Sequence, residues 1–239
     1  MLTGLPVIYG IDPHSEESVP QHKFGTVGFA DDGRRFRYAK AGTSALVAGD
    51  LLQCPAEVTT EESLTPTAAL AGATQVTVTT GAAVTANKYA EGFLVVTNTP
   101  GNGLMYKIKS HPANAGAASL VLTLEEPLIV ALTASSRVDL VFNPYNGVLQ
   151  NPATPTGCPV GVAVKAITGA YYGWIQDQGA CSVLAGGNIT VGRQVTANLG
   201  TAASVIVAAN GATEAFPAVG YALTTVVNGE NASIFLTIG

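Results

Sequence analysis

Hydrophobic and polar residues alternate in short runs along most of the chain. In RFRYAKAG (residues 35–42), Phe36 and Tyr38 alternate with arginines, and in TQVTVTTG (residues 74–81) valine alternates with threonine. Successive side chains of a β-strand point to opposite faces, so this period of two indicates strands with one buried face. The pattern therefore predicts a chain built from short β-strands.

Turn-forming residues separate these runs. The stretch GFLVVTNTPGNGLMYKIKSH (residues 92–111) indicates two strands joined by a Pro-Gly-Asn-Gly turn, which is a strong hairpin signal. Short strands at this spacing are typical of a small barrel or sandwich. Further strand candidates, each bounded by Gly, Asn or Pro, occupy residues 118–128, 137–147, 160–167, 171–178, 188–197, 218–227 and 232–239.

A short internal echo indicates how the strands group. FRYAKAGTSALVAGD (residues 36–50) and YYGWIQDQGACSVLAGG (residues 171–187) share an aromatic-x-aromatic run, a glycine turn and a small apolar stretch ending in Ala-Gly. This echo favours one β-barrel or sandwich domain formed by residues 34–57 and 144–239. We expect a second β domain, residues 58–143, to be inserted into it.

The segment in front of these domains has a different character. Residues 1–33 contain Pro6, Pro13, Pro20 and the polar cluster DPHSEESVPQH without a sustained period, which predicts an extended N-terminal arm. The start lacks the basic and apolar regions of a signal peptide. No apolar run in the chain approaches the roughly 20 residues that span a bilayer, so we expect no membrane partner.

Composition supports a mainly β fold class. Of the 239 residues, 11% are charged, 47% are hydrophobic and only 7% are aromatic. An average soluble domain has about 25% charged residues. The 27 glycines and 13 prolines supply many turns. Small, β-branched and turn-forming residues suit short strands, whereas helices favour Glu, Lys, Leu and Arg.

The low charge content also bears on function. Uncharged faces that remain in water tend to associate, so we expect this chain to be covered by copies of itself or by another protein. The net charge is −5 and the isoelectric point is near 5.1. This balance argues against direct nucleic-acid binding, which usually requires a basic face.

The titratable residues form no recognisable catalytic or metal-binding motif. The carboxylate pairs Glu16-Glu17, Glu61-Glu62 and Glu125-Glu126 are adjacent in sequence, and adjacent strand residues point apart, so we interpret them as solvated turns. The histidines are scattered without metal-ligand spacing. The sequence therefore predicts a protein that is not an enzyme and that holds no metal or cofactor.

The three cysteines give no clear framework. Cys54, Cys158 and Cys181 are odd in number and fit neither a disulfide scaffold nor a C-x-x-C metal pattern. We expect them to be reduced small hydrophobic residues, with a Cys158–Cys181 bridge as the alternative.

Two groups of residues are candidates for binding a partner. The basic group stands beside Asp31 and Asp32 and is expected to pair with carboxylates of a neighbouring subunit or another acidic surface, with phosphate contact as the alternative. The aromatic group is expected to lie in a core or subunit interface, with a sugar-stacking platform as the alternative. These candidates are Arg34, Arg35, Arg37 and Lys40 in the basic group, and Tyr171, Tyr172 and Trp174 in the aromatic group.

Several stretches resemble virion structural proteins of tailed bacteriophages. GRRFRYAKAGTSALVAGDLLQ (residues 33–53) has their Ala/Val/Thr/Gly-rich texture. LAGGNITVGRQVTANLG (residues 184–200) and the final stretch, residues 218–239, are similar to phage head decoration, or cement, proteins. In that family a small barrel carries a G-D/R-x-V turn and a V-G-x-A strand, which match Gly192–Val195 and Val219–Ala222 here.

The resemblance implies a non-enzymatic role on the outside of a capsid. A decoration protein binds the major capsid protein lattice, often as a trimer, and stabilises the head by bridging neighbouring subunits. Such a protein is made in the host cytoplasm and ends on the virion exterior. A tail or baseplate component is a variant of this expectation, and a carbohydrate-binding or adhesin-like module is the alternative from another class.

Overall fold

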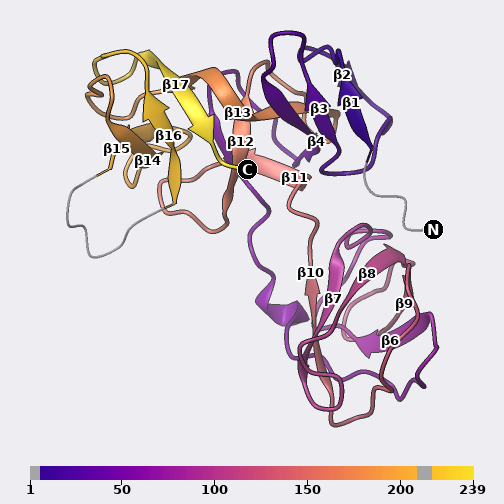
Figure 1. The fold of residues 1–239 in the computed structure, drawn as a ribbon. Helices are drawn as coiled ribbons and strands as arrows, with labels where there is room; N and C mark the ends of the chain where they lie inside the picture. The colour runs from indigo at the N-terminus through magenta and orange to yellow at the C-terminus, as the bar shows by residue number, and fades with distance from the viewer. Residues whose placement is uncertain (1–5, 209–216) are drawn as a thin grey trace. The chain divides into compact units, whose positions relative to one another are not determined.

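The computed structural model describes residues 6–208 and 217–239, and it confirms the mainly β fold class. The chain divides into two compact units (Figure 1). Unit 1 comprises Met1–Ala56 and Pro144–Gly239, and unit 2 comprises Glu57–Asn143. The bounds expected for the inserted domain, residues 58–143, lie within one residue of unit 2, whereas the segment expected as a separate N-terminal arm falls within unit 1.

Unit 1 contains a closed barrel. Each strand of this first barrel pairs with the next, and the last pairs back with the first, so no edge is left open. Its interior is filled by small and branched side chains such as Leu52, Val148 and Ile175. In ring order the strands are β4 (Arg35–Ala41), β11 (Asn146–Gln150), β5 (Leu51–Gln53), β12 (Pro159–Ala163) and β13 (Tyr172–Leu184).

The second half of β13 continues into another barrel. A parallel bridge between Ala185 and Val205 closes this second barrel. Val183, Val219 and Ile234 are among its fully buried core residues. After β13 its strands are, in order, β17 (Asn231–Thr237), β16 (Ala218–Ala222), β14 (Gln194–Ala197) and β15 (Val205–Val207). A single long strand is therefore a wall of both barrels.

The sequence predicted that the N-terminal segment is an extended arm, and the structure differs from this prediction. Residues 1–5 lie outside the described residues, but the rest of the segment joins the sheet of unit 1. Strand β3 (Val27–Phe29) pairs with β4, β1 (Val7–Tyr9) pairs with β3, and β2 (Glu16–Glu17) pairs with β13. A Cβ on Gly28 would lie 2.7 Å from Trp174, so glycine permits this close crossing.

Unit 2 is a separate small barrel. Its core contains Tyr106, Ile108 and Leu122. The chain segment that follows a 3-10 turn, η1 (Thr59–Glu61), bridges both edges of the sheet through the pairs Leu64–Val138 and Pro66–Val78. The sheet order is β10 (Arg137–Val141), β7 (Phe93–Asn98), β8 (Met105–Ser110), β9 (Ser119–Leu124) and β6 (Gln75–Thr79).

Unit 1 repeats one local element that we call the hook. A hook is a single bridging residue followed by a turn and then, five residues on, by a new strand. The hooks bridge in pairs, Leu46 with Ile167 and Ile189 with Val226. The third residue after each bridging residue has a positive φ, at Gly49, Ala170, Gly192 and Gly229. The internal echo in the sequence overlaps two of these hooks but does not show their period.

Candidate functional site

Two of the four predicted basic residues are paired inside the chain. The Nε atoms of Arg35 and Arg37 donate to the two carboxylate oxygens of Asp177, each at 2.9 Å. Asp177 is fully buried, and Arg37 also donates to the carbonyl oxygen of Gly25 at 3.2 Å. The sequence predicted that these arginines pair with carboxylates of another subunit, but their partner Asp177 lies on β13 of the same chain.

The other two basic residues lie nearer the surface. Arg34 donates to Asp32 at 2.7 Å and reaches Gln176 at 3.4 Å. The hydrogen bonds from the backbone and side chain of Arg34 lower the pKa of Asp32. Lys40 places its ammonium 5.5 Å from the centre of the Tyr172 ring. The basic group is therefore largely neutralised or covered within unit 1.

The predicted aromatic group divides between core and surface. Trp174 is only 4% exposed and packs with Phe36 and Tyr38. Tyr172 is half-buried, with its ring 6.2 Å from that of Tyr38, and Tyr171 is exposed. A sugar-stacking platform needs an accessible ring, so the burial of Trp174 argues against that alternative.

The aromatic core also holds the N-terminal segment. The hydroxyl of Tyr38 donates to Glu17 and accepts from the backbone N–H of Gln21, both at 3.0 Å. The His22 ring lies 5.0 Å from that of Tyr38 and 5.4 Å from that of Trp174. Burial, the main cause, and the Glu17 carboxylate raise the pKa of Tyr38 to about 12. These contacts explain why the segment lies against the barrel.

Two of the carboxylate pairs are not solvated turns. Glu61 is fully buried in unit 2 and accepts a hydrogen bond from the backbone N–H of Ala82 at 3.1 Å. Glu16 accepts one from the backbone N–H of Thr168 at 2.7 Å, within unit 1. Sequence reasoning missed both because the partner of each carboxylate lies in a distant segment.

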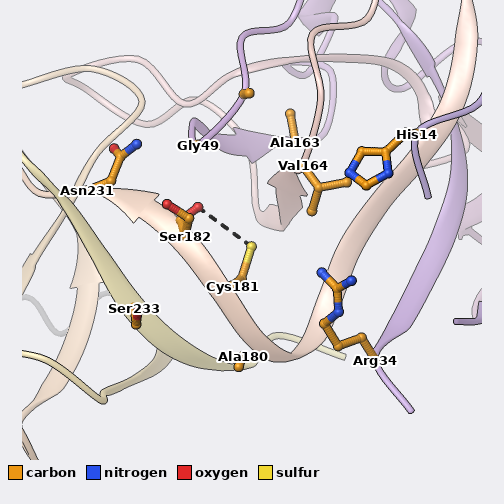
Figure 2. Close-up of a pocket in the computed structure, with 11 residues that line it drawn as sticks. His14, Arg34, Gly49, Ala163, Val164, Ala180, Cys181, Ser182, Asn231 and Ser233 are labelled. Carbon is orange, nitrogen blue, oxygen red and sulfur yellow. Dashed lines mark hydrogen bonds between the residues drawn. The ribbon is translucent and has the colours of Figure 1, made fainter. Parts of the chain in front are cut away.

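A pocket of about 450 Å³ lies beside the second half of β13 in unit 1 (Figure 2). His14 and Arg34 stand on one side of it, and Asn231 and Ser233 on the other. The Cys181 thiol lies between these sides, where its Sγ is 3.6 Å from the carbonyl oxygen of Ser182. Burial raises the pKa of Cys181 to about 12, so this thiol stays protonated at neutral pH and is a weak nucleophile.

The strands of the second barrel present a row of uncharged side chains on their outer surface. Tyr221 and Phe235 lie directly opposite each other on β16 and β17, and they are 48% and 44% exposed. Alternate residues of the neighbouring strands lie on the same outer face of the sheet as this pair. We call this surface the uncharged face, and its members are Gln178, Ala180, Ser182, Gln194, Tyr221, Ser233, Phe235 and Thr237.

Unit 2 carries a second apolar surface. Backbone hydrogen bonds in both directions join Ala69 and Leu132, at 3.0 and 2.9 Å, and hold two loops together. Leu70 is 80% exposed and Ile129 is 72% exposed beside the partly exposed Val130. We call residues 68–71 with 129–130 the apolar loop pair, and none of these residues is charged. Sequence reasoning missed this surface, because no short pattern shows the pairing that brings the two loops together.

The described ranges, 6–208 and 217–239, contain no cluster of three or more His, Cys, Asp or Glu residues that could hold a metal ion. The same part of the chain has no helix long and apolar enough to cross a membrane. Comparison with protein-family models, curated proteins and solved structures finds no match for this chain.

Proposed function

We propose that this chain is a non-enzymatic structural protein of a tailed-phage virion, acting as a decoration protein on the outside of the capsid. The observation that carries the proposal is the presence of two separate uncharged surfaces, one on each unit. A protein that bridges neighbours needs at least two contact surfaces. The uncharged face and the apolar loop pair meet this need.

The chemistry of both surfaces suits protein contact. Removing apolar area from water favours a contact, and part of this gain offsets the freedom that the partners lose on association. Phe235 and Tyr221 are aromatic anchors of the kind enriched at interfaces, and they are surrounded by small uncharged residues. Each contact can be modest, because many copies on one shell add their contacts together.

The internal pairing of the basic group supports a protein partner over nucleic acid. Arg35 and Arg37 share Asp177, and Arg34 is bound to Asp32. Few unpaired cations are therefore left to neutralise phosphates on this side of unit 1, in a chain with a net charge of −5. We assign the uncharged face to the major capsid protein and the apolar loop pair to a neighbouring copy, in a homo-oligomer such as a trimer.

Reconstitution tests this function. Purified protein is mixed with empty shells assembled from the major capsid protein of the same phage, and binding is measured by co-sedimentation and electron microscopy. We expect ordered density on the shell exterior, and at least a tenfold loss of affinity for Phe235→Ser. Val47→Ser, at an exposed residue outside the uncharged face, is the matched control.

The two surfaces can be tested separately. Leu70→Ser is expected to lower the oligomeric state in sedimentation velocity while Phe235→Ser leaves it unchanged. Failure of the wild-type protein to bind shells would overturn the proposed function. Shell binding by Phe235→Ser with unchanged affinity would overturn the assignment of the uncharged face.

A further inference from the structure

Cys54 and Cys158 lie opposite each other at one end of the first barrel. The backbone N–H of Cys54 donates to the carbonyl oxygen of Cys158 at 2.9 Å, and the N–H of Cys158 donates to Cys54 Sγ at 3.2 Å. This pair directly continues the register of β5 and β12, in which Gln53 is opposite Pro159. All three cysteines of the chain are free thiols in the structure.

The surrounding residues hold the two cysteines in this position. The buried side chain of Gln53 makes two hydrogen bonds with Thr156. Its Nε2 donates to the hydroxyl of Thr156 at 2.8 Å, and its Oε1 accepts from the backbone N–H of Thr156 at 3.2 Å. A Cβ on Gly157 would lie 2.9 Å from Cys54 Sγ, so glycine leaves the space that this thiol occupies. The turn before β12 is thus clamped to the end of β5.

This geometry suits a disulfide. Residues directly opposite each other in an antiparallel pair have Cα atoms about 4.5–5.5 Å apart, and disulfides form at Cα separations of about 4.4–6.8 Å. Cys158 is exposed, and Cys54 is half-buried. We propose that Cys54 and Cys158 form a reversible dithiol–disulfide site that reacts with low-molecular-weight disulfides of the glutathione class.

The reaction proceeds by two exchanges. Cys158 loses its proton, and its Sγ attacks one sulfur of the small disulfide, forming a mixed disulfide and releasing one small thiol. Cys54 then loses its proton and attacks Cys158 Sγ, forming the Cys54–Cys158 bond and releasing the second small thiol. The two protein thiols are oxidised, and one small disulfide is reduced to two thiols. Burial raises the pKa of Cys54 and so lowers its thiolate fraction, which makes the exposed Cys158 the first thiol to react and leaves Cys54 the intramolecular second step.

The position of the pair gives the bond a structural consequence. Residues 54 and 158 flank unit 2, Glu57–Asn143, on both sides in the sequence. Strand β5 lies between β11 and β12, so the bond would fasten the end of β5 to β12 where the chain leaves for unit 2. On the proposed virion function, the pair would be reduced in the host cytoplasm and would close after release. The bond itself does not depend on that function.

The test uses the purified full-length chain without capsids, so its result is independent of the proposed function. The protein is incubated with excess oxidised glutathione, quenched with acid, digested and analysed by mass spectrometry. We expect the loss of two hydrogen atoms from the intact protein, a cross-linked peptide containing Cys54 and Cys158, and full reversal by dithiothreitol. The melting temperature should rise by several degrees on oxidation.

Three variants complete the test. Cys54→Ser should stop at a stable glutathione adduct on Cys158, and Cys158→Ser should form no intramolecular bond. Cys181→Ser should behave as wild type, because this buried thiol takes no part. A wild-type protein that stops at the glutathione adduct, or that links Cys181 to either partner, would overturn the proposal.

Discussion

Trp174 and Tyr38 lie directly opposite each other on β13 and β4, with their rings edge to face and 5.2 Å between centroids. The N-terminal segment covers this pair through His22 and Gly28. Trp174 is the only tryptophan of the chain, so its fluorescence reports on this core alone. The ring of Trp174 is thus packed in the interior of unit 1.

Truncation of this ring should destabilise unit 1. Trp174→Ala is expected to lower the free energy of unfolding by about 3–5 kcal/mol, because it removes a large buried side chain. Chemical denaturation followed by circular dichroism measures the loss. Tyr171→Ala, three residues earlier in the sequence but exposed, is the control and should leave the midpoint nearly unchanged. Equal losses in the two variants would contradict the burial of Trp174.

Asp177 is expected to be the most sensitive charged residue of unit 1. Asp177→Asn removes the anion that Arg35 and Arg37 share, and should cost about 2–3 kcal/mol of stability. This is less than the cost for a wholly buried pair, because both guanidinium groups retain some solvent contact. Asp32→Asn breaks an exposed pair and should show no resolvable change in the urea midpoint. An unchanged free energy of unfolding for Asp177→Asn would contradict the expectation that this shared anion stabilises unit 1.

The pH dependence of stability should contain two contributions of opposite sign. Burial raises the pKa of Asp50, although a hydrogen bond from Gln150 acts against the shift. The folded state therefore binds this proton more tightly than the unfolded state. Asp50 therefore lowers the free energy of unfolding as the pH rises from the ordinary pKa of an aspartate, about 3.9, to the raised pKa of Asp50 in the folded state. Asp50→Asn should remove this decline and stabilise the protein at neutral pH, as measured by urea titrations at several pH values.

Glu16 should behave in the reverse manner. Hydrogen bonds from the hydroxyl and the backbone N–H of Thr168 are the main causes that lower its pKa. This contribution is present above the ordinary pKa of glutamate and is lost as the pH falls through the lowered one. Glu16→Gln should therefore flatten the acid limb of the same stability profile. A steeper acid limb in this variant would show that the sign is wrong.

The hooks offer a matched test of backbone conformation. Ala170 has a φ of +66° at the position where the other three hooks have Gly49, Gly192 and Gly229. Ala170→Gly should stabilise the chain by about 0.5–1 kcal/mol, and Gly229→Ala should destabilise it by about 1 kcal/mol. No atom lies within 4 Å of a Cβ built on Gly229, so sterics will not obscure the comparison. Thermal unfolding of both variants measures the effect.

Local sequence patterns identify the longer strands but not the contacts that join them. The period of two identified β4 and β6, and the internal echo indicated the division near residues 57 and 143. The closing bridges, such as Leu64–Val138, involve residues far apart in the chain, and no short pattern reveals them.

The incorrect predictions for the arginines and for the N-terminal segment have the same origin, which is contact between residues far apart in the chain. Arg37 and its partner Asp177 are 140 residues apart, so no local pattern indicates that they are paired. The N-terminal segment lacks a sustained period because its three strands are only two or three residues long. Its order depends on contacts with the aromatic core, and the alternation within β4 and β13 does not indicate those contacts.

The sharing of β13 makes unit 1 thermodynamically indivisible. Residues 172–178 pair with β4 and residues 178–184 pair with β17, so neither barrel can lose this strand without opening the other. Calorimetry should show both barrels melting in one cooperative transition. Unit 2 shares no described strand with unit 1, and its melting should be a second transition of its own.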